Sequence, residues 1–173
     1  MNVRKAEKKD ISAVTEIYGD IHTAEESGNF TIGWIRGVYP VRETAEAALG
    51  RGDLFVMEDG GAVVGTGIIN RMQVESYRAG NWRFPAEDSD VMVLHTLVIL
   101  PHCSGKGYGK AFVAFYENYA RENGCHYLRI DTNARNSNAR AMYKKLGYAE
   151  IGIIPTVFNG IPDVQLVLLE KKL

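Results

Sequence analysis

Cysteine is scarce in this sequence, and an excess of charge of one sign is missing. The two cysteines, Cys103 and Cys125, lie far apart and lack the CxxC spacing of redox and zinc sites. We therefore expect no structural disulfide and no metal site, and reduced thiols favour a cytoplasmic protein. Lys and Arg number 20 against 21 Asp and Glu, a net charge of -1, so the sequence does not predict a nucleic-acid binder.

Long hydrophobic runs are also absent. The longest apolar stretches, such as Val91 to Leu94, are much too short to cross a bilayer, and Met1 to Glu7 contains no apolar signal segment. No repeat, low-complexity tract or linker divides the chain. From 173 residues with 46% hydrophobic content we expect one globular domain over residues 1–173 that does not enter a membrane.

The hydrophobic periodicity predicts a mixed sheet with helices on its faces, an α+β fold. Apolar residues spaced by three and four predict a helix over residues 10–27 with Asp10 as its N-cap. Residues 54–57 and 62–69 flank a turn and predict an antiparallel hairpin. Further helices are predicted after Pro40, after a glycine-rich turn at 104–110 and over 139–146, and further strands at 91–99, 127–130, 148–153 and 164–169.

The glycine-rich turn joins the apolar strand 91–99 to the next helix. Three alternating glycines let a ligand approach the backbone, and free N–H groups at a helix start favour phosphate oxygens. The spacing does not match the GxGxxG dinucleotide fingerprint, and Ala111 stands where a P-loop requires Ser or Thr. The turn therefore predicts a site for an anion other than ATP; a tight turn that binds nothing is the alternative.

Two motifs together resemble the GNAT superfamily of N-acetyltransferases. The cofactor motif of that family is written Q/R-x-x-G-x-G/A, and the turn matches it except that Ser104 replaces the Gln or Arg. The segment Asn136 to Tyr148 resembles the second signature, N-x-x-A-x-x-x-Y-x-x-x-G-F/Y. The resemblance spans most of the chain. It implies the GNAT fold, a mostly antiparallel sheet of about seven strands with about four helices, in which the fourth and fifth strands splay apart.

The resemblance also implies acetyl-CoA as the cofactor. Its pantetheine would lie between the splayed strands and its pyrophosphate on the turn, beside two lysines. The implied cofactor-binding residues are Leu97, Val98 and Ile99 through backbone groups, Asn136, and the turn residues Ser104, Gly105, Lys106, Gly107, Tyr108, Gly109 and Lys110. The implied activity is transfer of the acetyl group to a primary amine by direct attack in a ternary complex.

Two roles in that chemistry follow from the resemblance. Tyr143 occupies the general-acid position of the second signature, where its hydroxyl would meet the coenzyme sulfur. Packing on the inner face of its helix is the alternative role. A backbone N–H near Val98 would stabilise the oxyanion.

The general base is less determined. Val93 stands where many family members carry Glu, and His95, on the same face of a regular strand, has an ordinary pKa near ~6.5 that suits proton relay. A structural histidine, a water relay, Glu26 and Glu75 are the alternatives. His102 and Cys103 point to opposite faces of an extended chain, so a covalent acyl-cysteine is not expected.

Aromatic residues are the candidates for the acceptor pocket. They are Trp34, Tyr39 and Tyr77, with Trp82 and Phe158 as further possibilities. A small-molecule amine is the expected acceptor, and homodimerisation is an expectation from the fold alone. A non-catalytic acyl-CoA-binding sensor is the alternative function, and the presence of Tyr143 and His95 favours the enzyme.

Overall fold

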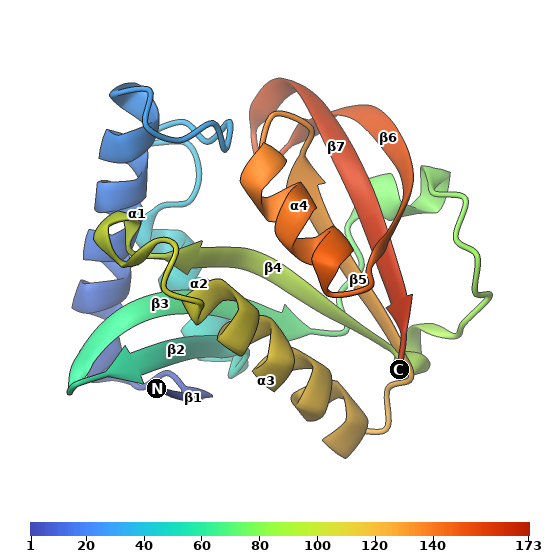
Figure 1. The fold of residues 1–173 in the computed structure, drawn as a ribbon, viewed down its shortest axis with the longest axis horizontal. Coiled ribbons are helices and arrows are strands. Elements are labelled where there is room, and N and C mark those ends of the chain that lie inside the picture. The colour runs from blue at the N-terminus through green and yellow to red at the C-terminus, as the bar shows by residue number, and fades with distance from the viewer.

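The computed structural model describes residues 1–173 as one seven-stranded sheet with four α-helices (Figure 1). The spatial strand order is β1-β2-β3-β4-β5-β7-β6. The strands are β1 (Asn2–Lys5), β2 (Leu54–Asp59), β3 (Ala62–Asn70), β4 (Val91–Ile99), β5 (Tyr127–Asn133), β6 (Ala149–Phe158) and β7 (Ile161–Lys172); the helices are α1 (Ile11–Glu26), α2 (Arg42–Arg51), α3 (Tyr108–Glu122) and α4 (Ser137–Lys145). The predicted α+β class is confirmed.

The fourth and fifth strands separate along their length. They form the only parallel pair of the sheet, and they pair over Val91–Leu94 and Tyr127–Ile130 alone. Beyond that point β4 stays paired with β3 as far as Ile99, and β5 stays paired with β7 as far as Asn133. The two strands therefore diverge, as Figure 1 shows, and the edge of β4 that faces β5 has no strand partner. The predicted splay is confirmed.

A bulge interrupts β4 at the same place. Thr66 and Ile68 of β3 pair with Val98 and His95, so two residues of β4 lie opposite one residue of β3. Thr96, inside the bulge, has a φ of 50°, a left-handed conformation that costs a threonine on the order of 1–3 kcal/mol. Bulges and strained residues of this kind are common at binding and catalytic sites.

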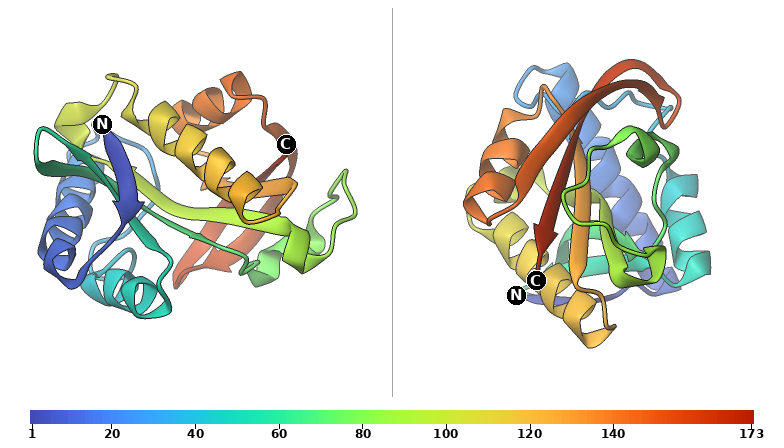
Figure 2. Two further views of the ribbon diagram at one scale, coloured as in Figure 1. Left: turned by 90° about the horizontal axis from the view of Figure 1, so that it is seen from below. Right: turned by 90° about the vertical axis from the view of Figure 1, so that its right-hand side faces the viewer.

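The helices cover both faces of the sheet (Figure 2). One apolar cluster joins α3 and α4 to the sheet, with Phe112 and Tyr116 fully buried, and a second joins α1 and α2 to the opposite face, with Val14 and Ala45 fully buried. Burying each large apolar side chain contributes roughly 1.5–3 kcal/mol, so these clusters hold the helices on the sheet. None of the helices combines the length and apolar character that a membrane crossing requires.

Three details differ from the sequence predictions. Asp10 does not cap α1 with its side chain; its carboxylate accepts hydrogen bonds from the Arg4 guanidinium at 2.7 Å and from the Glu7 N–H at 2.7 Å. The short edge strand β1 was not predicted, because Val3 is the only apolar residue in a charged stretch. The last two strands are longer than predicted, since they form one hairpin around Asn159 and Gly160.

Candidate active site

The glycine-rich turn presents open backbone at the start of α3. Gly105 and Gly107 have φ values of 79° and 88°, which favour glycine, and a Cβ at either position would meet no atom within 4 Å. The space above the turn is therefore free for a ligand. Gly109 has a different role, because a Cβ there would lie 3.0 Å from the Met142 sulfur; this glycine lets α3 pack against α4.

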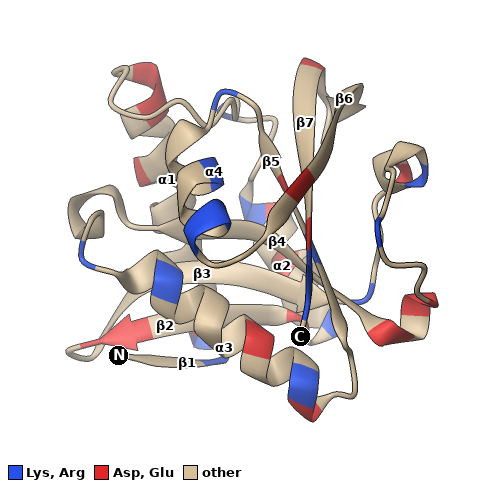
Figure 3. Cartoon of the chain, turned by 45° about the vertical axis from the view of Figure 1, so that its right-hand side comes forward, with Lys and Arg blue, Asp and Glu red and all other residues tan.

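Backbone N–H groups and lysines give the turn a positive potential. The first main-chain bond of α3 runs from the Ala111 N–H to the Gly107 carbonyl, so the N–H groups before it are free at the positive end of the helix dipole. Lys106 and Lys110 are exposed, and Figure 3 shows basic positions on the turn, at the start of α3 and on α4. The turn therefore fits a pyrophosphate.

The side chain of Tyr108 is directed away from the turn. The Tyr108 hydroxyl donates to the Asp59 carboxylate at 2.7 Å, which directs this side chain to the end of β2. Ser104 is exposed in extended backbone before Gly105. The backbone cradle consequently does not depend on a side chain at the first motif position.

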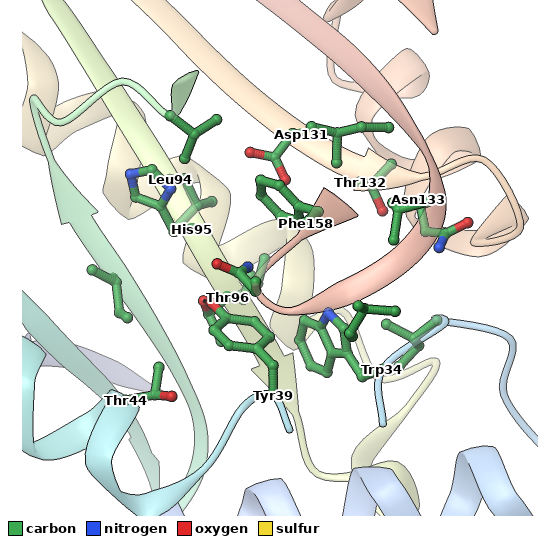
Figure 4. Close-up of a pocket in the computed structure, with 18 of the residues that line it drawn as sticks. Trp34, Tyr39, Thr44, Leu94, His95, Thr96, Asp131, Thr132, Asn133 and Phe158 are labelled. Atoms are coloured by element: carbon green, nitrogen blue, oxygen red, sulfur yellow. Dashed lines mark hydrogen bonds between the residues drawn. The ribbon is translucent and has the colours of Figure 1, made fainter. Parts of the chain in front are cut away.

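Between the diverging ends of β4 and β5 lies a cavity of about 360 Å³ (Figure 4). Residues of seven helices and strands and of the loop before α2 line it, among them Leu97 of β4, Asn136 at the N-terminus of α4 and Tyr143 of α4. The Asn136 side-chain oxygen accepts the Ala139 N–H at 3.1 Å, so its amide N–H₂ remains available to a ligand. Val98 and Ile99 continue the β4 edge that has no partner on the β5 side. A pantetheine arm fits this edge.

Tyr143 is buried and faces the cavity. Its ring packs edge-to-face on Tyr148, with ring centroids 5.8 Å apart. Burial raises the pKa of the Tyr143 hydroxyl well above its ordinary value, and the Asp131 carboxylate raises it further. The hydroxyl therefore stays protonated and can donate to a thiolate, as a general acid must.

His95 lines the cavity, but its environment differs from the expectation. Burial lowers its pKa from 6.5 to about 4, although a hydrogen bond with the Met72 backbone acts in the opposite direction. The Asn70 amide oxygen is fixed by accepting the Met72 N–H, while the Asn70 amide N–H₂ donates to Asp53. His95 Nε2, 3.1 Å from that oxygen, must therefore carry the proton. The ring is neutral and weakly basic, so the predicted pKa near 6.5 is wrong.

Asp131 is a cavity residue that the sequence reasoning missed. It follows the buried run of β5, and its carboxylate points into the cavity beside Phe158 in Figure 4. Burial raises the pKa of Asp131 from 3.8 to about 6, and a hydrogen bond from the Tyr77 hydroxyl, 2.8 Å long, limits the rise. A carboxylate at the carboxyl end of a buried strand was the available signal.

The aromatic candidates divide into two groups. Trp34, Tyr39 and Phe158 line the cavity, and the first two pack edge-to-face with centroids 5.9 Å apart. Tyr77 and Trp82 do not line it: Tyr77 is 2% exposed, and Trp82 packs on it and on the Arg129 guanidinium. The prediction that Tyr77 contacts the acceptor is therefore corrected, because this ring is in the core and reaches the cavity only through Asp131.

Two contacts hold the loop before α2, one to α1 and one to the turn after β5. Glu25 accepts the N–H of Gly33 at 3.0 Å, and the Thr31 hydroxyl donates to the Arg135 carbonyl at 3.0 Å. A Cβ at Gly33 would meet the Asn133 amide nitrogen, and the φ of 85° at this position favours glycine. The loop thereby places Trp34 and Tyr39 in the cavity wall.

The remaining candidates lie outside the cavity. Val93 is fully buried in the core, Glu26 pairs with Arg36 at the surface, and Glu75 is exposed. Cys103 is buried and makes no disulfide, and no group of three or more His, Cys, Asp or Glu side chains is arranged to hold a metal ion. Neither glutamate is placed to act as the base.

The sequence matches the model of the acetyltransferase (GNAT) family over residues 14–148. The chain belongs to this family. L-methionine sulfoximine/L-methionine sulfone acetyltransferase of Salmonella typhimurium is 26% identical over 161 residues, which cover 91% of this chain and 85% of that protein. Two other curated acetyltransferases match over shorter segments, so that the chain spans only 40% and 41% of their lengths.

Solved structures of GNAT proteins share the fold. A GNAT-family acetyltransferase of Streptococcus agalactiae superposes with a TM-score of 0.82 at 19% identity, covering 99% of this chain and 95% of that chain. A Salmonella typhimurium protein whose structure contains its cofactor acetyl-CoA superposes with a TM-score of 0.71 at 20% identity, covering 99% and 93%. At these identities the superpositions establish the fold alone.

Proposed function

We propose that this chain transfers the acetyl group of acetyl-CoA to a small primary amine. One observation carries the proposal: Tyr143 lines a cavity that opens between the separated ends of β4 and β5. The same cavity has the β4 edge on one side and an aromatic wall on the other, so the residues that suit a thioester and those that suit an amine share one space.

The turn and β4 fit acetyl-CoA. Free N–H groups at the start of α3, with Lys106 and Lys110, would hold the pyrophosphate, and the unpaired β4 edge from Leu97 to Ile99 would hydrogen-bond the pantetheine amides. Acetyl-CoA supplies an activated carbonyl carbon when it is bound. A β4 backbone N–H near Val98 would donate to the developing oxyanion, and Tyr143 would protonate the departing sulfur.

The size of the cavity supports a small acceptor. About 360 Å³ lies within the range of small-molecule sites. Trp34, Tyr39 and Phe158 offer ring faces to a cationic amine. The relative named for L-methionine sulfoximine makes amino-acid derivatives the first acceptors to test.

The test is Tyr143→Phe in an assay that measures free thiol released from acetyl-CoA over a panel of amines. Because general acid catalysis contributes about 10²–10⁴-fold, we expect kcat to fall by about a hundredfold with acetyl-CoA affinity unchanged. Tyr148→Phe is the matched control, since Tyr148 packs against Tyr143 outside the cavity. Equal kcat for wild type and Tyr143→Phe would remove the general-acid role.

A further inference from the structure

Asp131 is the only carboxylate that lines the cavity. It lies on β5, across the opening from the β4 edge, and the pairing of β5 with β7 fixes its backbone opposite Leu168. The Tyr77 hydroxyl donates to its Oδ2 atom at 2.8 Å, and Tyr77 itself is held in the core by Trp82. One carboxylate oxygen is thereby fixed from outside the cavity. The other, Oδ1, takes no protein hydrogen bond and is left for a ligand.

The charged and titratable groups around Asp131 come from several elements. The charge of Asp131 raises the pKa of Tyr39 in the loop before α2, of Tyr143 in α4 and of Tyr77 in η2 (Glu75–Ala79). These three phenols are neutral at physiological pH because burial raises the pKa of each one.

The basic groups nearby are otherwise engaged. Arg51 of α2 lines the cavity but makes two hydrogen bonds to Asp53, at 2.8 and 3.1 Å. Arg129, two residues before Asp131 on β5, bonds Gln73 and stacks under Trp82. His95 of β4 is neutral. No basic group forms an ion pair with Asp131, so its negative charge is free to attract a cation.

We infer that Asp131 is the proton acceptor for the amine nucleophile and that Tyr77 is the positioning residue that holds it; this inference rests on the proposed function. An amine enters the cavity as an ammonium ion, drawn by the carboxylate and by the rings of Trp34 and Phe158. One N–H bond breaks, its electron pair remains on nitrogen as the nucleophilic lone pair, and the proton binds to an Asp131 carboxylate oxygen. Solvent at the cavity mouth then takes this proton.

His95 serves this step less well. A general base is most effective when its pKa lies near the operating pH, and Asp131, with a pKa of about 6, is closer to neutrality than His95, with a pKa of about 4. The proton on His95 Nε2 is also directed at Asn70. His95 consequently lines the cavity as a neutral side chain and does not accept the proton.

The experiment measures kcat/KM for the best acceptor amine as a function of pH, with saturating acetyl-CoA. For the wild type we expect kcat/KM to rise with a midpoint around pH 6, where Asp131 ionises, to reach a plateau above that pH, and to fall only above the pKa of the amine. For Asp131→Asn we expect a loss of about a hundredfold at pH 7 and no plateau. The remaining rate should climb up to the pKa of the amine, because only free amine then reacts.

Tyr77→Phe tests the positioning role. Because the Tyr77 hydroxyl lowers the pKa of Asp131, its removal should move the acidic limb of the profile to higher pH. Tyr18→Phe is the control: it removes a buried hydroxyl that has no partner and does not touch Asp131, so the limb should not move. A merely structural Tyr77 would change the amount of folded protein without moving the limb.

The results distinguish three cases: no catalysis, Asp131 as the base and His95 as the base. If wild type shows no turnover on any amine, the proposed function fails and the role of Asp131 fails with it. If wild type is active and Asp131→Asn keeps the same rate and limb, only the inference is overturned. If His95→Gln removes the limb and Asp131→Asn does not, His95 is the base and the assignment to Asp131 is wrong.

Discussion

At the Asp131 carboxylate, burial and a hydrogen bond act in opposite directions on one pKa. Burial raises it to about 6, while Tyr77 holds it below the value that burial alone would give. The folded chain therefore binds this proton more tightly than the unfolded chain, whose aspartate has an ordinary pKa of 3.8. The free energy of unfolding should fall as the pH rises from about 4 to about 6, and this contribution is then constant.

Asp131→Asn should remove this penalty. Above pH 6 we expect the variant to be more stable than wild type by about 1–3 kcal/mol, less than the full shift implies because solvent reaches the carboxylate from the cavity. Near pH 4 the two proteins should be equally stable. Urea unfolding at both pH values measures the difference, and Asp20→Asn, at an exposed position of α1, is the control for the change in net charge. A variant less stable than wild type at pH 7.5 would show that the carboxylate is needed for folding.

At the scale of elements, the glycine-rich turn and the first turn of α3 form one unit. Gly107 is the N-cap of α3 in the left-handed conformation, and nothing in the chain occupies the space above it. A β-branched residue there would be strained and would also fill the space assigned to the pyrophosphate.

Gly107→Val should weaken acetyl-CoA binding at least tenfold, as measured by calorimetry on folded protein. The matched control is Gly124→Val: Gly124 has a φ of 71° and open space around it, but it follows the far end of α3. Both variants should lose a similar 1–3 kcal/mol of stability from backbone strain, and only Gly107→Val should lose affinity. Unchanged affinity in folded Gly107→Val would refute the placement of the pyrophosphate on this turn.

Elements with strong local patterns were predictable from the sequence. Helix α1, the glycine-rich turn and the helix that carries Tyr143 each have apolar spacing or turn residues that identify the element from its own short segment of sequence. Strand β1 was not predictable, because Val3 and its charged neighbours have no strand pattern of their own. The segment is a strand because its backbone pairs with β2. The side-chain role of Asp10 was mistaken for a similar reason, since Arg4 competes for the carboxylate.

At the scale of the whole molecule, the cavity results from long-range convergence. Trp34, His95, Asp131 and Tyr143 come from separate parts of the chain and meet because β4 and β5 diverge. A sequence motif identified Tyr143, but the burial of Tyr77 depends on how a loop of weak periodicity packs on β5 and β7. The place of Asp131 in the cavity depends on the pairing of β5 with β7 and on its separation from β4. Spacing along the chain does not carry that information.

The most direct measurement combines wild-type protein with acetyl-CoA and a panel of small primary amines, and follows both products by mass spectrometry. We predict free CoA and an acceptor carrying one added acetyl group for at least one amine, with neither product when the amine is omitted. Amino-acid derivatives such as L-methionine sulfoximine are the first members of the panel. Tight binding of acetyl-CoA without acetylation of any amine would contradict the account and favour a non-catalytic acyl-CoA sensor on the same fold.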